Sequence, residues 1–155
     1  MWEPLQRFSA LSPKARELFR LTVLLGPLVG ASLRFRGYNK TRQWLQKRLD
    51  RRAIQYRETS EIPVPLEMTC RMVRAAERYS LVRMTCLEES LVLWYLLQSQ
   101  GIPATLRIGV RKPAGNLEAH AWVEQDGMAL IQTGEHHRHY QPFDTDGTNL
   151  PPEQP

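Results

Sequence analysis

Apolar residues in the first part of the chain recur at helical spacing. Ser12-Pro13 is typical of a helix start, because a side-chain cap is followed by proline at the first helical position. Leucines then follow every three or four residues up to Gly26-Pro27. We expect that helix to break or kink there, since proline lacks the amide hydrogen that an interior turn needs. Further helices are expected on either side of a proline-rich joint at 61–65, over about 41–56 and 66–79.

The following segment combines one apolar helix with short strands. Thr85 can cap a helix that has Glu88 at its third position, which forms a capping box, and Gly101 can end it. Alternation of apolar and polar residues over 104–111 then predicts a strand, and two further strands are expected over 117–124 and 128–132, joined by a hairpin turn. The pattern therefore predicts an α+β fold, in which a helix packs on a small antiparallel sheet and further helices precede it.

Charge divides the chain into unequal parts. Residues 1–60 contain 13 Lys/Arg and 4 Asp/Glu, a net charge of +9, whereas the remainder carries −4. We expect a basic helical N-terminal extension (1–60), a compact core (61–135) and a polar C-terminal tail (136–155). Nucleic acid, lipid headgroups and an acidic peptide all attract basic segments, and a solvated helix face is the simpler alternative. Without a groove-reading motif, we expect the extension to dock a protein partner rather than nucleic acid.

Length and cysteine content narrow the class of protein. A chain of 155 residues fits one compact domain, and its two cysteines form neither a CxxC motif nor a disulfide framework. A reducing cytoplasm is the expected location, since the N-terminus lacks the basic start and cleavage site of a signal peptide. The longest apolar stretch, 21–33, is shorter than the ~20 residues of a membrane span. We expect a core or interface helix there rather than a membrane-surface helix.

Cys86 and His120 are the residues best placed for chemistry. Cys86 falls in the first turn of the expected buried helix, where backbone N–H groups favour a thiolate and can stabilise an oxyanion. His120 falls on a strand, which gives an imidazole a fixed direction as general base. The alternatives are a buried structural thiol for Cys86 and a packed or surface imidazole for His120. Cys70 lies inside an expected helix and is interpreted as inert core.

Three sequence blocks carry a resemblance to a known family: Thr85-Cys-Leu-Glu-Glu-Ser-Leu91, Gly101-Ile-Pro-Ala-Thr-Leu-Arg-Ile-Gly-Val-Arg111 and Ala119-His-Ala-Trp-Val-Glu-Gln-Asp-Gly127. In this order the chain resembles the lasso-peptide leader peptidases, the microcin-processing proteins of the transglutaminase-like superfamily, over about 66–134. The resemblance implies a papain-like Cys-His-Asp protease, with Cys86 as nucleophile and His120 as base. It also implies that the protein removes a leader from a ribosomally made precursor. An asparagine-synthetase-like cyclase then closes the released core into a lactam ring. The resemblance implies no cofactor.

The third catalytic position departs from the family pattern. The family's acid tends to lie about twelve residues after the histidine, and Gln132 occupies that position here. An amide can still orient an imidazole by accepting a hydrogen bond from its ring. Asp126 is the nearest alternative acid, although its place before Gly127 is typical of a type I′ turn residue. Glu124 shares the strand face of His120, where it would either tune the base or be solvated.

The sequence leaves two other functions open. One is a non-catalytic or repurposed transglutaminase-like module that binds a peptide, because Gln132 breaks the acid pattern. The other is a different thioester-based acyl transferase. The run His136-His137-Arg138-His139 is interpreted as a polar loop, since no cysteine or acid lies at the spacing of a metal site. A leader-binding module is typically rich in strands, so we expect a separate small protein to bind the leader.

Overall fold

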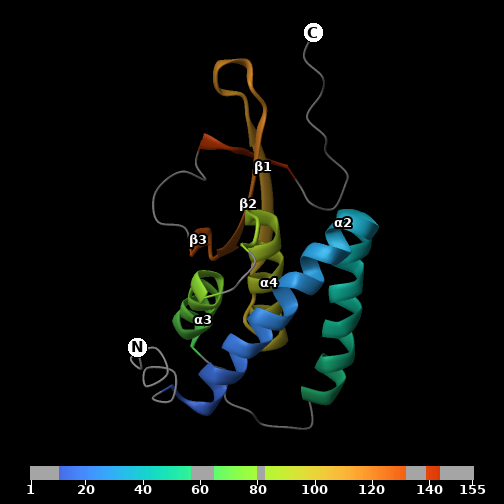
Figure 1. Cartoon of the computed structure of the whole chain (residues 1–155), viewed down its shortest axis with the longest axis vertical. Helices are drawn as coiled ribbons and strands as arrows, with labels where there is room; N and C mark the ends of the chain where they lie inside the picture. Colours follow the sequence, from blue (N-terminus) through green and yellow to red (C-terminus); the bar gives the residue numbers. More distant parts are fainter. Residues whose placement is uncertain (1–10, 57–64, 80–82, 132–138, 144–155) are drawn as a thin grey trace.

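The computed structural model describes residues 11–56, 65–79, 83–131 and 139–143, and the account below is limited to them. Helix α4 lies at the centre, between the helices α2 and α3 and a small sheet (Figure 1). The elements in chain order are α2 (Pro13–Tyr56), α3 (Leu66–Tyr79), α4 (Cys86–Ser99), β1 (Thr105–Arg111), the short 3-10 helix η1 (Pro113–Gly115), β2 (Glu118–Gln125), β3 (Met128–Leu130) and β4 (Gln141–Phe143). The α+β class expected from the sequence is confirmed.

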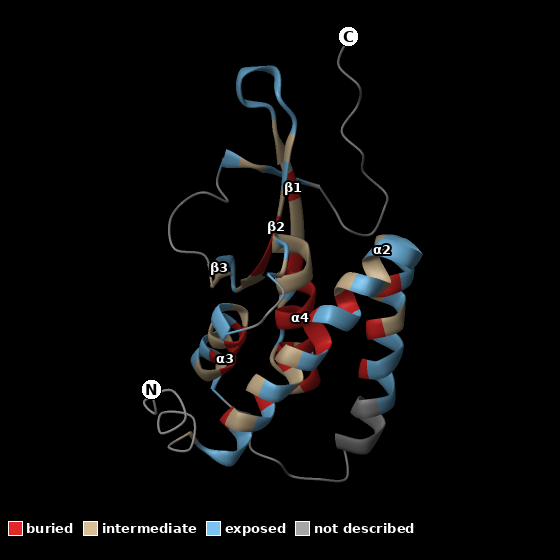
Figure 2. Ribbon diagram, viewed as in Figure 1, coloured by how far each residue is buried: buried red, intermediate tan, exposed pale blue. Residues whose placement is uncertain are grey.

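Helix α4 is buried on nearly every side. Every residue from Ser90 to Leu97 is buried, which is why this stretch is apolar all round rather than amphipathic. Figure 2 shows the buried residues concentrated on α4 and on the sides of the helices and strands that face it. Trp94 is 3% exposed, and the Arg42 guanidinium of α2 lies 4.8 Å from its ring centroid. The position of α4 is thus fixed by packing from both layers.

Helix α2 continues through Gly26-Pro27, so the expected break at that point is wrong. Pro27 is exposed. The carbonyl that loses its amide partner is one helical turn earlier and therefore lies on the same side of the helix. Leu25 and Val29, two residues to either side of Pro27 in the chain, are buried. The break comes instead at Gly37, with φ 75° and ψ 174°, a region open essentially to glycine alone. The two arms of α2 meet there and run back along each other (Figure 1). The hydroxyl of buried Thr41 fastens the corner by donating to the Gly37 carbonyl at 2.8 Å.

The sheet is antiparallel throughout, with the order β3-β2-β1-β4. Leu106 of β1 pairs with Val123 of β2, and both side chains are buried in the core cluster that α4 dominates. The hairpin turn between β2 and β3 is confirmed, because Asp126 (φ 51°) and Gly127 (φ 77°) both have the positive φ of a type I′ turn. This pairing leaves Leu106 and Val123 on the face of the sheet that covers α4.

Two features of the sheet were not expected. The third strand ends at Leu130 rather than at residue 132, because Ile131 has φ 68° and leaves the extended conformation. Strand β4 pairs with β1 through Gly109 opposite Pro142. A three-residue strand with proline at its centre carries no alternation signal, and proline is tolerated there because β4 is an edge strand within the described sheet.

One described helix is long and apolar enough to cross a membrane by length and composition alone, namely α2 over Pro13–Arg51. A third of its most apolar stretch is buried inside the fold. Core helices of soluble proteins share this length and composition, so these two properties do not place α2 in a membrane. The domain boundary expected between residues 60 and 61 lies outside the described residues; the described part of the N-terminal extension packs on α3 and α4.

Candidate functional site

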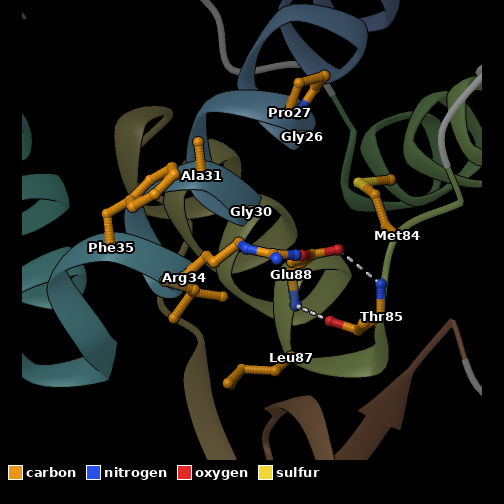
Figure 3. A pocket seen from close by; sticks show the side chains of 11 residues that line it. Gly26, Pro27, Gly30, Ala31, Arg34, Phe35, Met84, Thr85, Leu87 and Glu88 are labelled. Carbon is orange, nitrogen blue, oxygen red and sulfur yellow. Dashed lines mark hydrogen bonds between the residues drawn. The ribbon is translucent and has the colours of Figure 1, made fainter.

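Cys86 occupies the first position of a helix whose start is tightly capped. The Thr85 N–H donates to Glu88 Oε2 at 2.7 Å, and the Glu88 N–H donates to Thr85 Oγ1 at 3.3 Å, so the predicted capping box is confirmed (Figure 3). The backbone N–H groups of Cys86 and Leu87 have no acceptor among the described residues. These two N–H groups, together with the positive end of the helix dipole, are available to a thiolate or an oxyanion.

A partly buried carboxyl lies one helical turn beyond Cys86. Glu89 is three residues further along the chain and therefore near the same helix face. Burial and, next, the charge of Glu77 on α3 raise the pKa of the Glu89 carboxyl to about 7, whereas Arg74 acts to lower it. Glu89 Oε1 is buried without a hydrogen-bond partner among the described residues. Glu88 forms the cap, whereas Glu89 interacts with Glu77 and so links α4 to α3.

His120 is positioned by aromatic rings on both sides. Its ring stacks on that of Trp122, with centroids 6.0 Å apart and an interplanar angle of 18°, and lies 5.2 Å from the ring of Tyr140. Tyr140 precedes β4 and is itself held, because the Arg111 guanidinium lies 4.7 Å from its ring centroid and its hydroxyl donates to Glu118 Oε2 at 3.4 Å. Sequence reasoning missed Tyr140, since nothing near it in the chain marks it as a neighbour of His120.

Glu124 holds Trp122 rather than being solvated. Its carboxylate accepts from the Trp122 ring N–H at 2.7 Å and from Arg107 Nε at 3.2 Å. Trp122 is 2% exposed, and a Cβ on Gly109 of the neighbouring strand would come within 2.9 Å of its ring. Glycine at 109 is therefore what allows the Trp122 ring to lie across β1 and support His120.

Cys86 and His120 come from two elements that pack on each other, α4 and β2. Alternation along β2 places His120 with Trp122 on the face opposite Val123, and Val123 is the residue that packs into the α4 core. The described pairing between β2 and β3 begins at Val123, which lies three residues after His120 in the chain.

The other residues singled out from the sequence lie as follows. Asp126 is exposed in the hairpin turn, six residues along β2 from His120, or roughly 20 Å at the rise of an extended strand. Gln132 and residues 136–138 lie outside the described residues, and His139 is exposed. No cluster of metal-binding side chains occurs in the described part of the chain. Cys70 is half-buried on α3, where burial raises the pKa of its thiol and so disfavours the thiolate.

Comparison with known proteins places the chain in a family. A family model described as the transglutaminase-like superfamily matches residues 27–145, which include α2 from Pro27 onward, α3, α4 and the whole described sheet. Neither the curated proteins nor the solved structures contain a match to this chain. The family match covers most of the sequence and spans the helix start at Cys86 and the strand of His120. The chain therefore belongs to the transglutaminase-like superfamily.

Proposed function

We propose that this protein is a cysteine peptidase that removes the leader from a lasso-peptide precursor. Its superfamily commonly includes cysteine proteases and acyltransferases. The observation that carries the proposal is the place of Cys86, the first residue of a capped, buried helix within a transglutaminase-like domain. The finer assignment, to leader removal, rests on the three sequence blocks that resemble the lasso-peptide leader peptidases.

The proposed reaction divides peptide hydrolysis into two acyl transfers. The Cys86 thiolate adds to the scissile carbonyl carbon, and the N–H groups of Cys86 and Leu87 stabilise the oxyanion that forms. The imidazolium of His120 gives its proton to the leaving amine, so the C–N bond breaks and a thioester remains on Cys86. Neutral His120 then takes a proton from water, which attacks the thioester and releases the leader as a carboxylate with the thiolate restored.

The orientation of His120 is the second part of the proposal. Trp122 and Tyr140 limit the tilt of the imidazole through their ring contacts. We assign the hydrogen bond to its ring N–H to Gln132, with Asp126 as the alternative. The placement of Asp126 in the turn, roughly 20 Å along β2 from His120, favours Gln132. Gln132→Ala should then lower activity less than His120→Ala, because the aromatic contacts still restrain the ring.

The partners follow from the same resemblance. The substrate is a ribosomally made precursor in the cytoplasm, a separate small protein binds its leader, and an asparagine-synthetase-like cyclase uses the released core. The surface of α2 supports docking of that leader-binding protein, since residues 18–49 contain seven Lys/Arg and no Asp/Glu. Co-purification of the two proteins should be lost when exposed basic residues of α2 are reversed, as in Arg36→Glu combined with Lys47→Glu. Tight binding of duplex DNA at physiological salt would contradict this role.

The proposal is tested by reconstitution with a lasso-peptide precursor and a leader-binding protein. Mass spectrometry should find the leader and the core as two fragments that together gain one water. Cys86→Ala should abolish this product, whereas Cys70→Ala, the matched control on the other cysteine, should retain it. A product in which the acyl group has moved to an amine without gaining water would identify an acyl transferase instead. Precursor bound but unchanged would identify a peptide-binding module.

A further inference from the structure

A groove runs along α2 and ends at the residues on either side of Cys86. Its volume is about 600 Å³, within the range of small-ligand and peptide side-chain sites. One wall is the first arm of α2 and the other is the start of α4 (Figure 3). The lining from α4 and its approach consists of Met84, Thr85, Leu87 and Glu88.

Two glycines lie where these walls meet. A Cβ on Gly26 would lie 2.8 Å from Met84 Sδ, and a Cβ on Gly30 would lie 2.7 Å from Glu88 Oε1. Both separations are shorter than real Cβ contacts, so the end of the Met84 or the Glu88 side chain would have to move if the glycine beside it were replaced. The groove is therefore a consequence of the same packing that positions the capping box of Cys86.

The groove is mostly apolar, and its lining carries one positive side chain, Arg34, and one negative side chain, Glu88. Glu88 is already engaged by the Thr85 N–H in the cap. Arg34 has neither an ion pair nor a hydrogen bond to any residue that the structure describes. Phe35 at the rim is 82% exposed, an unusual state for so large an apolar side chain. Residues 18–49 contain seven Lys/Arg and no Asp/Glu, and this positive charge favours an acidic occupant over a basic one.

We propose that this groove binds the part of the substrate peptide next to the bond that Cys86 attacks, taking one apolar side chain with an acidic residue beside it. The inference rests on the proposed function, because it assigns the peptide's course from the nucleophile. Thr85 and Leu87 line the groove and are the chain neighbours of Cys86. A peptide advances at most about 3.6 Å per residue, so a residue within two or three positions of the scissile bond reaches the groove. The apolar side chain displaces water there, and the acidic residue pairs with Arg34.

The test uses the full-length protein at high concentration and a random peptide library, with products sequenced by mass spectrometry. Cleavage that depends on Cys86 should show an apolar residue at one position near the cut and an acidic residue adjacent to it. Ala31→Trp, which fills the groove, should reduce the apolar preference roughly tenfold or more. Arg34→Glu should reduce the acidic preference about two- to fivefold at low salt. Phe35→Ser, a change at an exposed position, should weaken the apolar preference without affecting the fold.

Matched controls lie on the same helix outside the groove. Asn39→Trp and Lys40→Glu introduce the same side chains at exposed positions and should leave both preferences unchanged. Preferences that are identical in the parent, Ala31→Trp and Arg34→Glu would overturn the groove assignment while leaving the peptidase intact. If the library is not cleaved although the reconstituted precursor is, the groove assignment is overturned and the proposed function stands. If Cys86-dependent cleavage is absent from both assays, the proposed function and this inference are overturned together. If Phe35→Ser and Arg34→Glu instead abolish binding to vesicles of phosphatidylglycerol and leave peptide preferences unchanged, the face binds lipid and the assignment is wrong.

Discussion

Replacing Glu89 with glutamine should make the protein more stable at neutral and alkaline pH. Glutamine keeps the shape of the carboxyl and can still donate a hydrogen bond toward Glu77, but it has no charge to bury. The folded-state pKa of Glu89 is about 7, against 4.5 for the same group in the unfolded chain. At 1.36 kcal/mol per pKa unit, ionising Glu89 in the fold costs up to about 3 kcal/mol.

The sign of the pH dependence follows from that difference. Below pH 4.5 the carboxyl is protonated in both states, so stability is unaffected by this group. Between about pH 4.5 and 7 only the unfolded chain releases the proton, and the free energy of unfolding falls as pH rises. Above pH 7 both states are ionised and the whole cost is present. Glu89→Gln should therefore match the parent near pH 4 and exceed it by up to about 3 kcal/mol at pH 8.

Urea unfolding of the parent and of Glu89→Gln at intervals from pH 4 to pH 8 measures this effect directly. Glu17→Gln is the control, because Glu17 is an exposed acid on α2 and its removal should change stability by less than about 0.5 kcal/mol. The groups that face Glu89 are Glu77 and Arg74, and neither is altered in these variants. A parent profile without a fall between pH 4.5 and 7, or a glutamine variant less stable than the parent at pH 8, would refute the reasoning.

Three further predictions concern catalysis. Cys86→Ala and Cys86→Ser should lower leader cleavage by at least about a thousandfold in a folded protein, while Cys70→Ala should cost only ~1 kcal/mol of stability; cleavage assays and thermal melts separate the two. Gln132→Asp should keep or raise activity and Asp126→Asn should be nearly silent, and the reverse result would make Asp126 the acid. Gly109→Ala should destabilise the fold by about 1–3 kcal/mol and lower kcat. The reason is that the new Cβ would lie 2.9 Å from both the Gln141 carbonyl oxygen and the Trp122 ring. Unchanged kinetics would show that Trp122 does not position His120.

Local sequence signals predicted those parts of the fold that local interactions determine. The capping box at Thr85 and Glu88 joins atoms three residues apart, and the Asp126-Gly127 turn requires positive φ at two adjacent positions. Both are therefore readable from a few consecutive residues. The central strands were found for the same reason, since alternation follows directly from one buried face.

Tertiary contacts determined the parts that the sequence did not reveal. The helix at Pro27 is retained because buried side chains on both sides hold it, and this packing overrides the local preference of proline. The pKa of Glu89 depends on Glu77, twelve residues earlier on another helix. Tyr140 reaches His120 from twenty residues later, by way of Arg111 and Glu118. None of these neighbours is marked by spacing along the chain.

The proposed catalytic pair is thus assembled from two layers that are fixed independently. The thiol belongs to the helical layer, where Gly26 and Gly30 of α2 lie against the Met84 and Glu88 side chains at the start of α4. The imidazole belongs to the sheet, where Gly109 sets how Trp122 lies beneath it. Because no covalent or local constraint links the two, their separation is determined by how α4 packs on Leu106 and Val123. Substitutions in that interface should therefore change the rate of the chemical step even though they touch neither Cys86 nor His120, since a proton transfer depends steeply on the distance between its donor and acceptor.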